Sequence, residues 1–169
     1  MIMDLEAVEV DAFLADSVAV ADGKLYAQGA GWDTIFTAVF PFRQPRIGIA
    51  AVLRIPWTAT NKMHDFSVKI VDPDEQEIVL GMAPPGAEQS DGKARQLRGQ
   101  FNLGRPATLN AGDSQVVPIA MNLDGLEFAE PNTYSVVIAV DGTDMRRLPI
   151  RVRSLVQMPG LAQAPRFGA

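Results

Sequence analysis

The chain has 169 residues, 47% of them hydrophobic and 21% charged, a composition typical of one globular domain. It contains no cysteine and a single histidine, His64, which excludes disulfides, thiolate metal sites, cysteine nucleophiles and multi-histidine metal centres. The formal net charge of -5 argues against a nucleic-acid partner, because phosphate contacts require clustered lysine and arginine.

The N-terminal residues include Asp4 and Glu6 and lack a basic segment followed by an apolar run, so the sequence predicts no signal peptide. No stretch approaches the roughly 20 apolar residues of a membrane span. The absence of cysteine fits a reducing compartment. We therefore expect a cytoplasmic protein with no membrane span.

Alternating apolar side chains, the pattern of half-buried strands, run through most of the chain and are separated by turn residues. Asp22-Gly23 is typical of a tight hairpin turn, and Asp72-Pro73-Asp74-Glu75 has the chemistry of a second turn. The expected strands, in chain order, cover residues 13–14 and 18–20, 24–28, 47–55, 66–71, 77–80, 96–103, 116–123, 134–140 and 147–153.

The clearest predicted element is a hairpin formed by residues 134–140 and 147–153 around the turn dipeptide Asp141-Gly142. In its second strand, Leu148, Ile150 and Val152 alternate with arginines, which predicts one buried face and one solvated cationic face. Pro149 lacks an amide donor, so this strand should lie at a sheet edge or pair irregularly there. The arginines of the cationic face are Arg147, Arg151 and Arg153.

No segment has a convincing helical pattern, and residues 83–94 and 104–112 are typical of loops. Eight or nine strands with turns every 8–12 residues predict an all-β fold, a single antiparallel β-sandwich of immunoglobulin-like or C2-like type. We expect this sandwich to occupy residues 1–153. Residues 154–169 form an apolar tail interrupted by two prolines.

Several segments combine turn glycines, aromatic residues and acids: Ala12–Asp16, Asp22–Tyr26, Gly29–Asp33, Pro56–Asn61 with His64, Asp72–Glu75, Phe101–Pro106, Pro131–Tyr134 and Val140–Gly142. In these segments the chain resembles an uncharacterised bacterial, largely actinobacterial family, a domain of unknown function. Asn132 and Thr133 stand where a Pro-Gly turn is commoner. The resemblance implies a β-sandwich and no known activity, and it carries over no catalytic residue.

A candidate ligand loop contains Trp57, Thr58, Asn61 and His64. A tryptophan beside hydroxyl and amide groups can stack on a sugar or another small ligand. The structural alternative is that Trp57 closes one end of the core, the polar residues satisfy the loop backbone, and His64 fixes the start of its strand.

Four aspartates define a candidate calcium site of the kind found in the apical loops of C2-like sandwiches. Asp72 and Asp74 lie in one turn, and Asp141 and Asp144 lie in another, so the site requires both turns at the same end of the molecule. Local turn formation explains Asp72, Asp74 and Asp141 without a metal, and we expect no metal and no cofactor.

No pattern indicates catalysis. None of the serines lies in a Gly-x-Ser-x-Gly elbow, and Gly29–Asp33 lacks the lysine and the following helix of a phosphate loop. Nothing in the sequence marks two carboxylates as facing each other. We therefore expect a protein that is not an enzyme.

Two features favour association with a protein partner. The solvated face with Arg147, Arg151 and Arg153 either protects an edge strand or meets an acidic surface such as that of residues 4–16. The tail is either a loose terminus or an arm whose Leu161 and Phe167 dock on a neighbouring subunit. We expect a non-catalytic interaction or scaffold module that forms a homo-oligomer; the alternative is a sandwich that binds calcium or carbohydrate at its loop ends.

Overall fold

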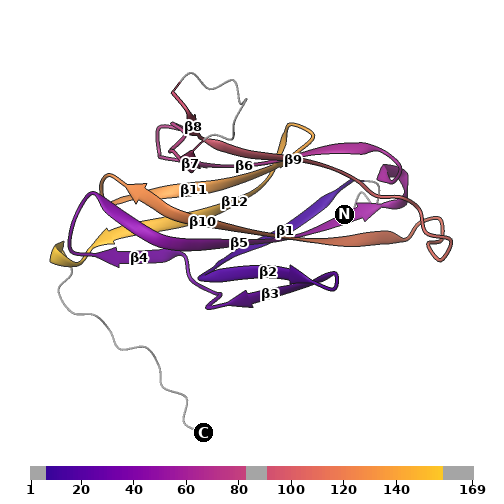
Figure 1. The fold of residues 1–169 in the computed structure, drawn as a ribbon, viewed down its shortest axis with the longest axis horizontal. Coiled ribbons are helices and arrows are strands. Elements are labelled where there is room, and N and C mark those ends of the chain that lie inside the picture. The colour runs from indigo at the N-terminus through magenta and orange to yellow at the C-terminus, as the bar shows by residue number, and fades with distance from the viewer. Residues whose placement is uncertain (1–6, 83–90, 158–169) are drawn as a thin grey trace, which may run out of the picture.

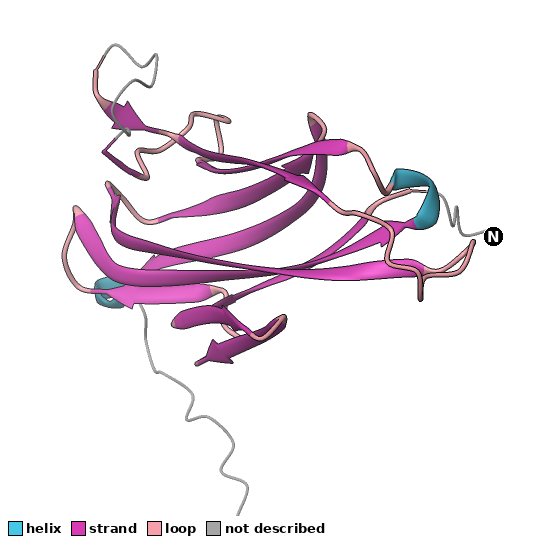
Figure 2. Ribbon diagram, turned by 45° about the vertical axis from the view of Figure 1, so that its right-hand side comes forward, coloured by secondary structure: helices cyan, strands magenta, loops and turns pink. Residues whose placement is uncertain are grey.

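The computed structural model describes residues 7–82 and 91–157 and is all-β, as the sequence predicts (Figures 1 and 2). Within these residues the helical segments are two single 3-10 turns, and no helix is long and apolar enough to cross a membrane. The elements are β1 (Glu9–Ala15), β2 (Ser17–Ala21), β3 (Lys24–Gln28), β4 (Thr34–Thr37), β5 (Phe42–Pro56), η1 (Trp57–Ala59), β6 (Met63–Val71), β7 (Gly81–Met82), β8 (Lys93–Ala94), β9 (Gln96–Asn102), β10 (Ser114–Phe128), β11 (Asn132–Val140), β12 (Thr143–Ser154) and η2 (Leu155–Gln157).

The strands form two larger sheets and two small ones. One larger sheet has the order β1-β5-β10, and the other has the order β4-β12-β11-β6-β9. The small sheets are the hairpin β2-β3 and the pair β7-β8, which lie on opposite sides of the molecule (Figures 1 and 2). The two larger sheets contribute to one hydrophobic core, in which residues of β5 meet residues of β6, β11 and β12.

The central strand β5 explains why residues 47–55 form a continuous apolar run. Ile47, Ile49 and Leu53 are fully buried in the main core, whereas Ala50, one residue out of phase, packs against Ala15 and Val18 beneath the β2-β3 hairpin. A strand that is covered on both faces has no solvated positions to fill with polar residues. The long apolar run therefore follows from the hairpin that lies over the second face of β5.

One expectation about pairing is wrong. The predicted sheets are purely antiparallel, but β4 pairs parallel with β12, with Thr34 opposite Arg151 and Thr37 opposite Ser154. The strand β4 has only four residues, too few for alternation to identify it. The pairing also explains how Pro149 fits within the sheet, because β4 covers β12 only from Arg151 onward and leaves Pro149 beyond its reach.

Other boundaries also differ from the prediction. Residues 77–80 form a single bridge, between Glu77 and Val71, rather than a strand, and the short strand β7 follows them. The strand expected at residues 116–123 is longer, because β10 pairs with β5 from Ser114 to Phe128. The hairpin of β11 and β12 is confirmed, and Asp141 and Gly142 both have positive φ, 50° and 76°.

Side chains secure two corners of the fold. Asn122 on β10 accepts a hydrogen bond from the Val18 amide (3.0 Å) and donates one to the Val18 carbonyl (2.8 Å). Its side-chain amide thus bonds to the backbone of β2 as a neighbouring strand would, and it attaches the β2-β3 hairpin to β10. Near the start of β11, the Tyr134 hydroxyl donates to the Glu130 carbonyl (3.2 Å) while its ring packs against Phe128. Burial raises the pKa of the Tyr134 phenol, which keeps that hydroxyl protonated as a donor.

Candidate functional site

The four residues of the predicted ligand loop lie where β5 leads through η1 into β6, at one end of the two larger sheets. Trp57 is half-buried, Thr58 and Asn61 are exposed, and His64 retains 5% of its accessible surface. Asn61 has a positive φ of 56°, and its amide donates to the Leu103 carbonyl (2.7 Å). The turn between η1 and β6 therefore explains why an asparagine stands at this position.

His64 joins two loops. Its Nδ1 lies 2.7 Å from Asp141 Oδ2 and its Nε2 lies 2.7 Å from the Ala59 carbonyl oxygen, while its ring stacks on Phe101. Because a carboxylate and a carbonyl only accept hydrogen bonds, the doubly protonated ring satisfies both contacts. Burial acts to lower the pKa of His64, but the hydrogen bonds with Ala59 and Asp141 together outweigh it, and the pKa is raised.

Asp141 is the partner of this contact and also shapes the β11-β12 turn. Its Oδ1 accepts from the Asp65 amide (2.9 Å), and its own amide donates to the Asp65 carbonyl (2.9 Å). The hydrogen bond from His64 is the main cause that lowers the pKa of the Asp141 carboxyl. The contacts agree with the structural alternative, in which His64 fixes the start of its strand.

Arg105 is a member of this cluster that the sequence analysis missed. Its Nε donates to Thr60 Oγ1 (2.6 Å), an Nη donates to the Trp57 carbonyl (3.0 Å), and the guanidinium carbon lies 4.2 Å from the centre of the Trp57 ring. The arginine thus occupies one face of the ring on which a sugar would stack. A lone arginine between Gly104 and Pro106 carries no sequence signal that predicts this role.

The aspartates of the candidate calcium site do not come together. Asp72 follows the last residue of β6, whereas Asp141 bonds to Asp65 near the first residues of the same strand, so the two turns lie at opposite ends of β6. Asp72 Oδ1 instead accepts from the amides of Asp74 and Gln76, both at 2.9 Å, which is a local turn. Among residues 7–82 and 91–157, no three His, Asp or Glu side chains are grouped as metal ligands.

The arginines predicted on the solvated face of β12 all have intramolecular partners. Arg147 forms a two-point contact with Glu75, with both distances 2.7 Å, and Arg151 pairs with Asp33. Arg153 donates to the Asn132 carbonyl (3.0 Å) and to Thr133 Oγ1 (2.9 Å). The neighbouring Arg146 is paired in register with the buried Ile138, so it points to the opposite face of β12, where it bonds to Asp11 of β1 (2.9 Å). Leu161 and Phe167 lie outside the described residues.

A groove of about 660 Å³ lies on the face of the five-stranded sheet that points away from the core; we call it the outer groove. Its form follows from side-chain size. Small residues meet across the middle strands, with Ser67 opposite Ala139, and Val137 lies beside them. Arg98 of β9 is paired with Ser67 on one side, and Asp144 of β12 is paired with Ala139 on the other. Side chains of opposite charge therefore flank the small residues that form the floor of the groove.

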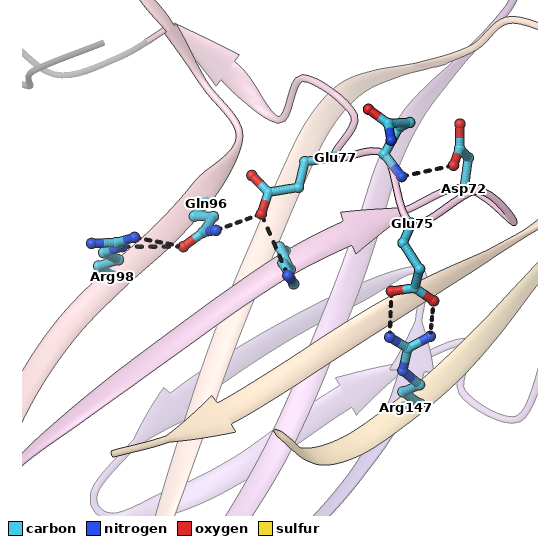
Figure 3. A network of polar contacts seen from close by, with 8 residues as sticks. Asp72, Glu75, Glu77, Gln96, Arg98 and Arg147 are labelled. Atoms are coloured by element: carbon cyan, nitrogen blue, oxygen red, sulfur yellow. Dashed lines mark hydrogen bonds and ion pairs between the residues drawn. The ribbon is translucent and has the colours of Figure 1, made fainter. Parts of the chain in front are cut away.

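A polar network lies along one part of this groove (Figure 3). Glu77 accepts from Gln96 (2.6 Å) and from Lys69 (3.4 Å), and Gln96 in turn accepts from Arg98 at 3.0 and 3.1 Å. Beyond it, the Arg147–Glu75 pair ties the loop after β6 to β12, and the hydrogen bond from Arg147 lowers the pKa of the Glu75 carboxyl. These contacts hold the long side chains beside the groove in defined positions.

A model of a protein family matches residues 10–153, which runs from the second residue of β1 to the residue before the last of β12. The chain belongs to the DUF6941 family. That family is described as one of unknown function, and the match confirms the resemblance to a domain of unknown function. No curated protein matches the chain.

Three of the segments that carry the resemblance to the family meet at the His64 end of the molecule. Pro56–Asn61 with His64, Phe101–Pro106 and Val140–Gly142 are joined there by the contacts of His64 with Asp141 and of Arg105 with Trp57. Segments that lie far apart along the chain thus form a single polar cluster, and its contacts are those of a structural clamp.

Proposed function

We propose that this chain is a non-catalytic interaction module that binds protein at the outer groove of the five-stranded sheet and associates with a second copy of itself beside that groove. The proposal rests on the outer groove beside β9, the last strand of that sheet. The groove combines apolar Val137 and Ala139 with the opposite charges of Arg98 and Asp144. A polypeptide offers matching polar and apolar groups, and an unpaired sheet edge offers backbone hydrogen bonds.

The absence of catalysis is part of this proposal. His64, the single imidazole of the chain, has both ring nitrogens within 2.7 Å of structural partners, so neither is available to take a proton from a substrate. Asp65 and Asp144 line the groove together with Ser67 and Lys69. Lys69 is paired with Glu77, and the imidazole that could activate the Ser67 hydroxyl is the one held by Asp141 and Ala59. A cytoplasmic location also belongs to the proposal, supported by a chain without cysteine.

We infer an immunoglobulin-like rather than a C2-like arrangement for the two larger sheets. Such domains carry a tyrosine near the start of the sixth strand whose hydroxyl bonds to the backbone a few residues upstream, as Tyr134 does with Glu130. The grouping of β1, β5 and β10 against β6, β11 and β12 supports the same arrangement. An experimental structure with a C2-like strand order would contradict it.

The mass of the full chain in solution tests the proposed function. Sedimentation velocity over a wide concentration range is expected to show a shift from monomer toward dimer. A monomer at every concentration would contradict self-association. A thermal-shift series with calcium and with glycans tests the alternative function at the loop ends, and we expect no rise in Tm, because Arg105 covers Trp57 and the aspartates lie apart.

A further inference from the structure

The edge strand β9 differs from the other edges of the two larger sheets. β10 contains Pro118 and is fastened to the β2-β3 hairpin through Asn122, β1 is tied to β12 by Asp11 and Arg146, and β4 has four residues. In the described part of the chain, β9 pairs only with β6 and has neither a proline nor a register shift. It thus lacks the proline, the register shift and the shortness that protect an edge against pairing with another strand, and Arg98 is its one charged residue.

The sequence of β9 is chemically symmetric about its middle residue, Gly99. Leu97 and Phe101, two residues on either side, are both packed against the core. Arg98 and Gln100 flank the glycine, and the amides Gln96 and Asn102 end the strand. When two copies pair antiparallel with Gly99 opposite Gly99, apolar residues face apolar residues on the inner side and polar residues face polar residues on the outer side.

This register is distinguished from its neighbours. A shift by one residue would place Leu97 opposite Gln100 and turn apolar side chains toward polar ones. A centre at Arg98 would set two arginines directly opposite each other, which is unfavourable. The pairing centred on Gly99 avoids both conflicts.

The charges beside the strand suit the same pairing. Arg98 of one copy lies opposite Gln100 of the other, and Gln100 uses its amide nitrogen to donate to Asp65 (2.8 Å), which leaves its side-chain oxygen as an acceptor. Asp65 is exposed and lies next to Gln100 in the register of β6 and β9. Each Arg98 therefore approaches an acceptor backed by a carboxylate of the second copy.

We propose that two copies of this chain associate through β9, in an antiparallel pairing centred on Gly99 that joins their five-stranded sheets across a two-fold axis. The inference rests on the self-association in the proposed function and names its interface. The joined sheet places the two outer grooves on one continuous face, so a partner that occupies one groove can extend into the second.

A charged substitution at the centre tests the interface. Gly99 has an ordinary φ, and a Cβ built there meets no atom within 4 Å, so Gly99→Lys does not strain the monomer. In the dimer it places two positive charges opposite each other, and we expect the dissociation constant to rise by about tenfold or more. Gly104→Lys is the matched control, because Gly104 is equally open but lies after β9.

Crosslinking tests the register. The chain has no cysteine, so Gly99→Cys introduces a single thiol. In the proposed dimer this thiol faces the same thiol of the second copy, and the two Cα atoms are about 5 Å apart, within the range of a disulfide. Under mild oxidation we expect covalent dimers from G99C and few from the control G104C. In the same register Gln96 of one copy lies opposite Asn102 of the other. A mixture of the single variants Q96C and N102C should therefore also crosslink, whereas Q96C by itself should not.

The outcomes separate this inference from the proposed function. If the unaltered chain stays monomeric, self-association itself is wrong. If the unaltered chain dimerises while G99K and G104K dimerise equally well and G99C does not crosslink, self-association survives and the β9 interface is wrong. Circular dichroism and Tm measurements on each variant confirm that a change in mass does not come from unfolding.

Discussion

At the scale of single residues, the buried contact of His64 with Asp141 and Ala59 has a defined dependence on pH. The pKa of His64 is raised in the folded chain, so its contribution to stability is fully present below the ordinary pKa of histidine, about 6.5. That contribution declines as the pH rises through the folded-state pKa, because the neutral ring has one donor for two acceptors.

We predict that the free energy of unfolding falls between about pH 6 and about pH 9 and that His64→Gln removes most of this decline. Relative to the unaltered chain, the free energy of unfolding of the variant should be lower by about 2 kcal/mol at the lower pH and by less at the higher pH, because the substitution breaks a buried charge-assisted contact. Urea denaturation of both proteins at both pH values measures this difference. An equal loss at both values would contradict the assignment of a charged ring.

Arg105 gives a second test at this scale. Arg105→Ala should lower the free energy of unfolding by about 1–2 kcal/mol, because it removes two hydrogen bonds and the cover over Trp57. Arg105→Lys should restore only part of this, since an ammonium group lacks the planar fork that reaches both oxygens. Urea denaturation compares the three proteins, and equal stability of the lysine and arginine forms would contradict the geometry.

At the scale of elements, alternation and turn chemistry predicted most strands and the β11-β12 hairpin with its Asp141-Gly142 turn, although β12 begins at Thr143 rather than at residue 147. The parallel strand β4 was missed because four residues carry no clear period. At the candidate site, His64 and Trp57 were found because their residue types are rare in this chain. Arg105 and the partners of the β12 arginines were not, because such contacts join residues that only the fold brings together.

The β2-β3 hairpin is the element whose attachment is most directly testable. Asn122→Ala removes both hydrogen bonds to Val18, and we expect faster hydrogen exchange of the Val18 amide with a loss of about 1–2 kcal/mol in stability. Asn110→Ala, at an exposed position in the loop before β10, is the matched control. Unchanged exchange at Val18 would show that packing alone holds the hairpin.

At the scale of the whole molecule, the strands and the family match together define the folding unit. The match ends at Arg153, and the last strand, β12, ends at Ser154. We therefore predict that a chain shortened after Gln157 keeps the Tm of the full chain within a few degrees. Circular dichroism on both proteins checks this, and a collapse of the Tm would mean that the last twelve residues, 158–169, contribute to the core.

Sedimentation of the same shortened chain also distinguishes association through β9 from association through the C-terminal tail. The pairing through β9 requires none of the residues after Gln157, so the shortened chain should dimerise as the full chain does. A loss of dimers on shortening would instead favour the tail with Leu161 and Phe167 as the docking arm.

The fastening of the β2-β3 hairpin by one side chain has a practical consequence. Its turn, Asp22-Gly23, projects from an element that belongs to neither of the two larger sheets, so extra residues placed there need not disturb either. An affinity tag or a reporter domain inserted between Asp22 and Gly23 should be tolerated, which offers a labelling position remote in the fold from both β9 and the outer groove.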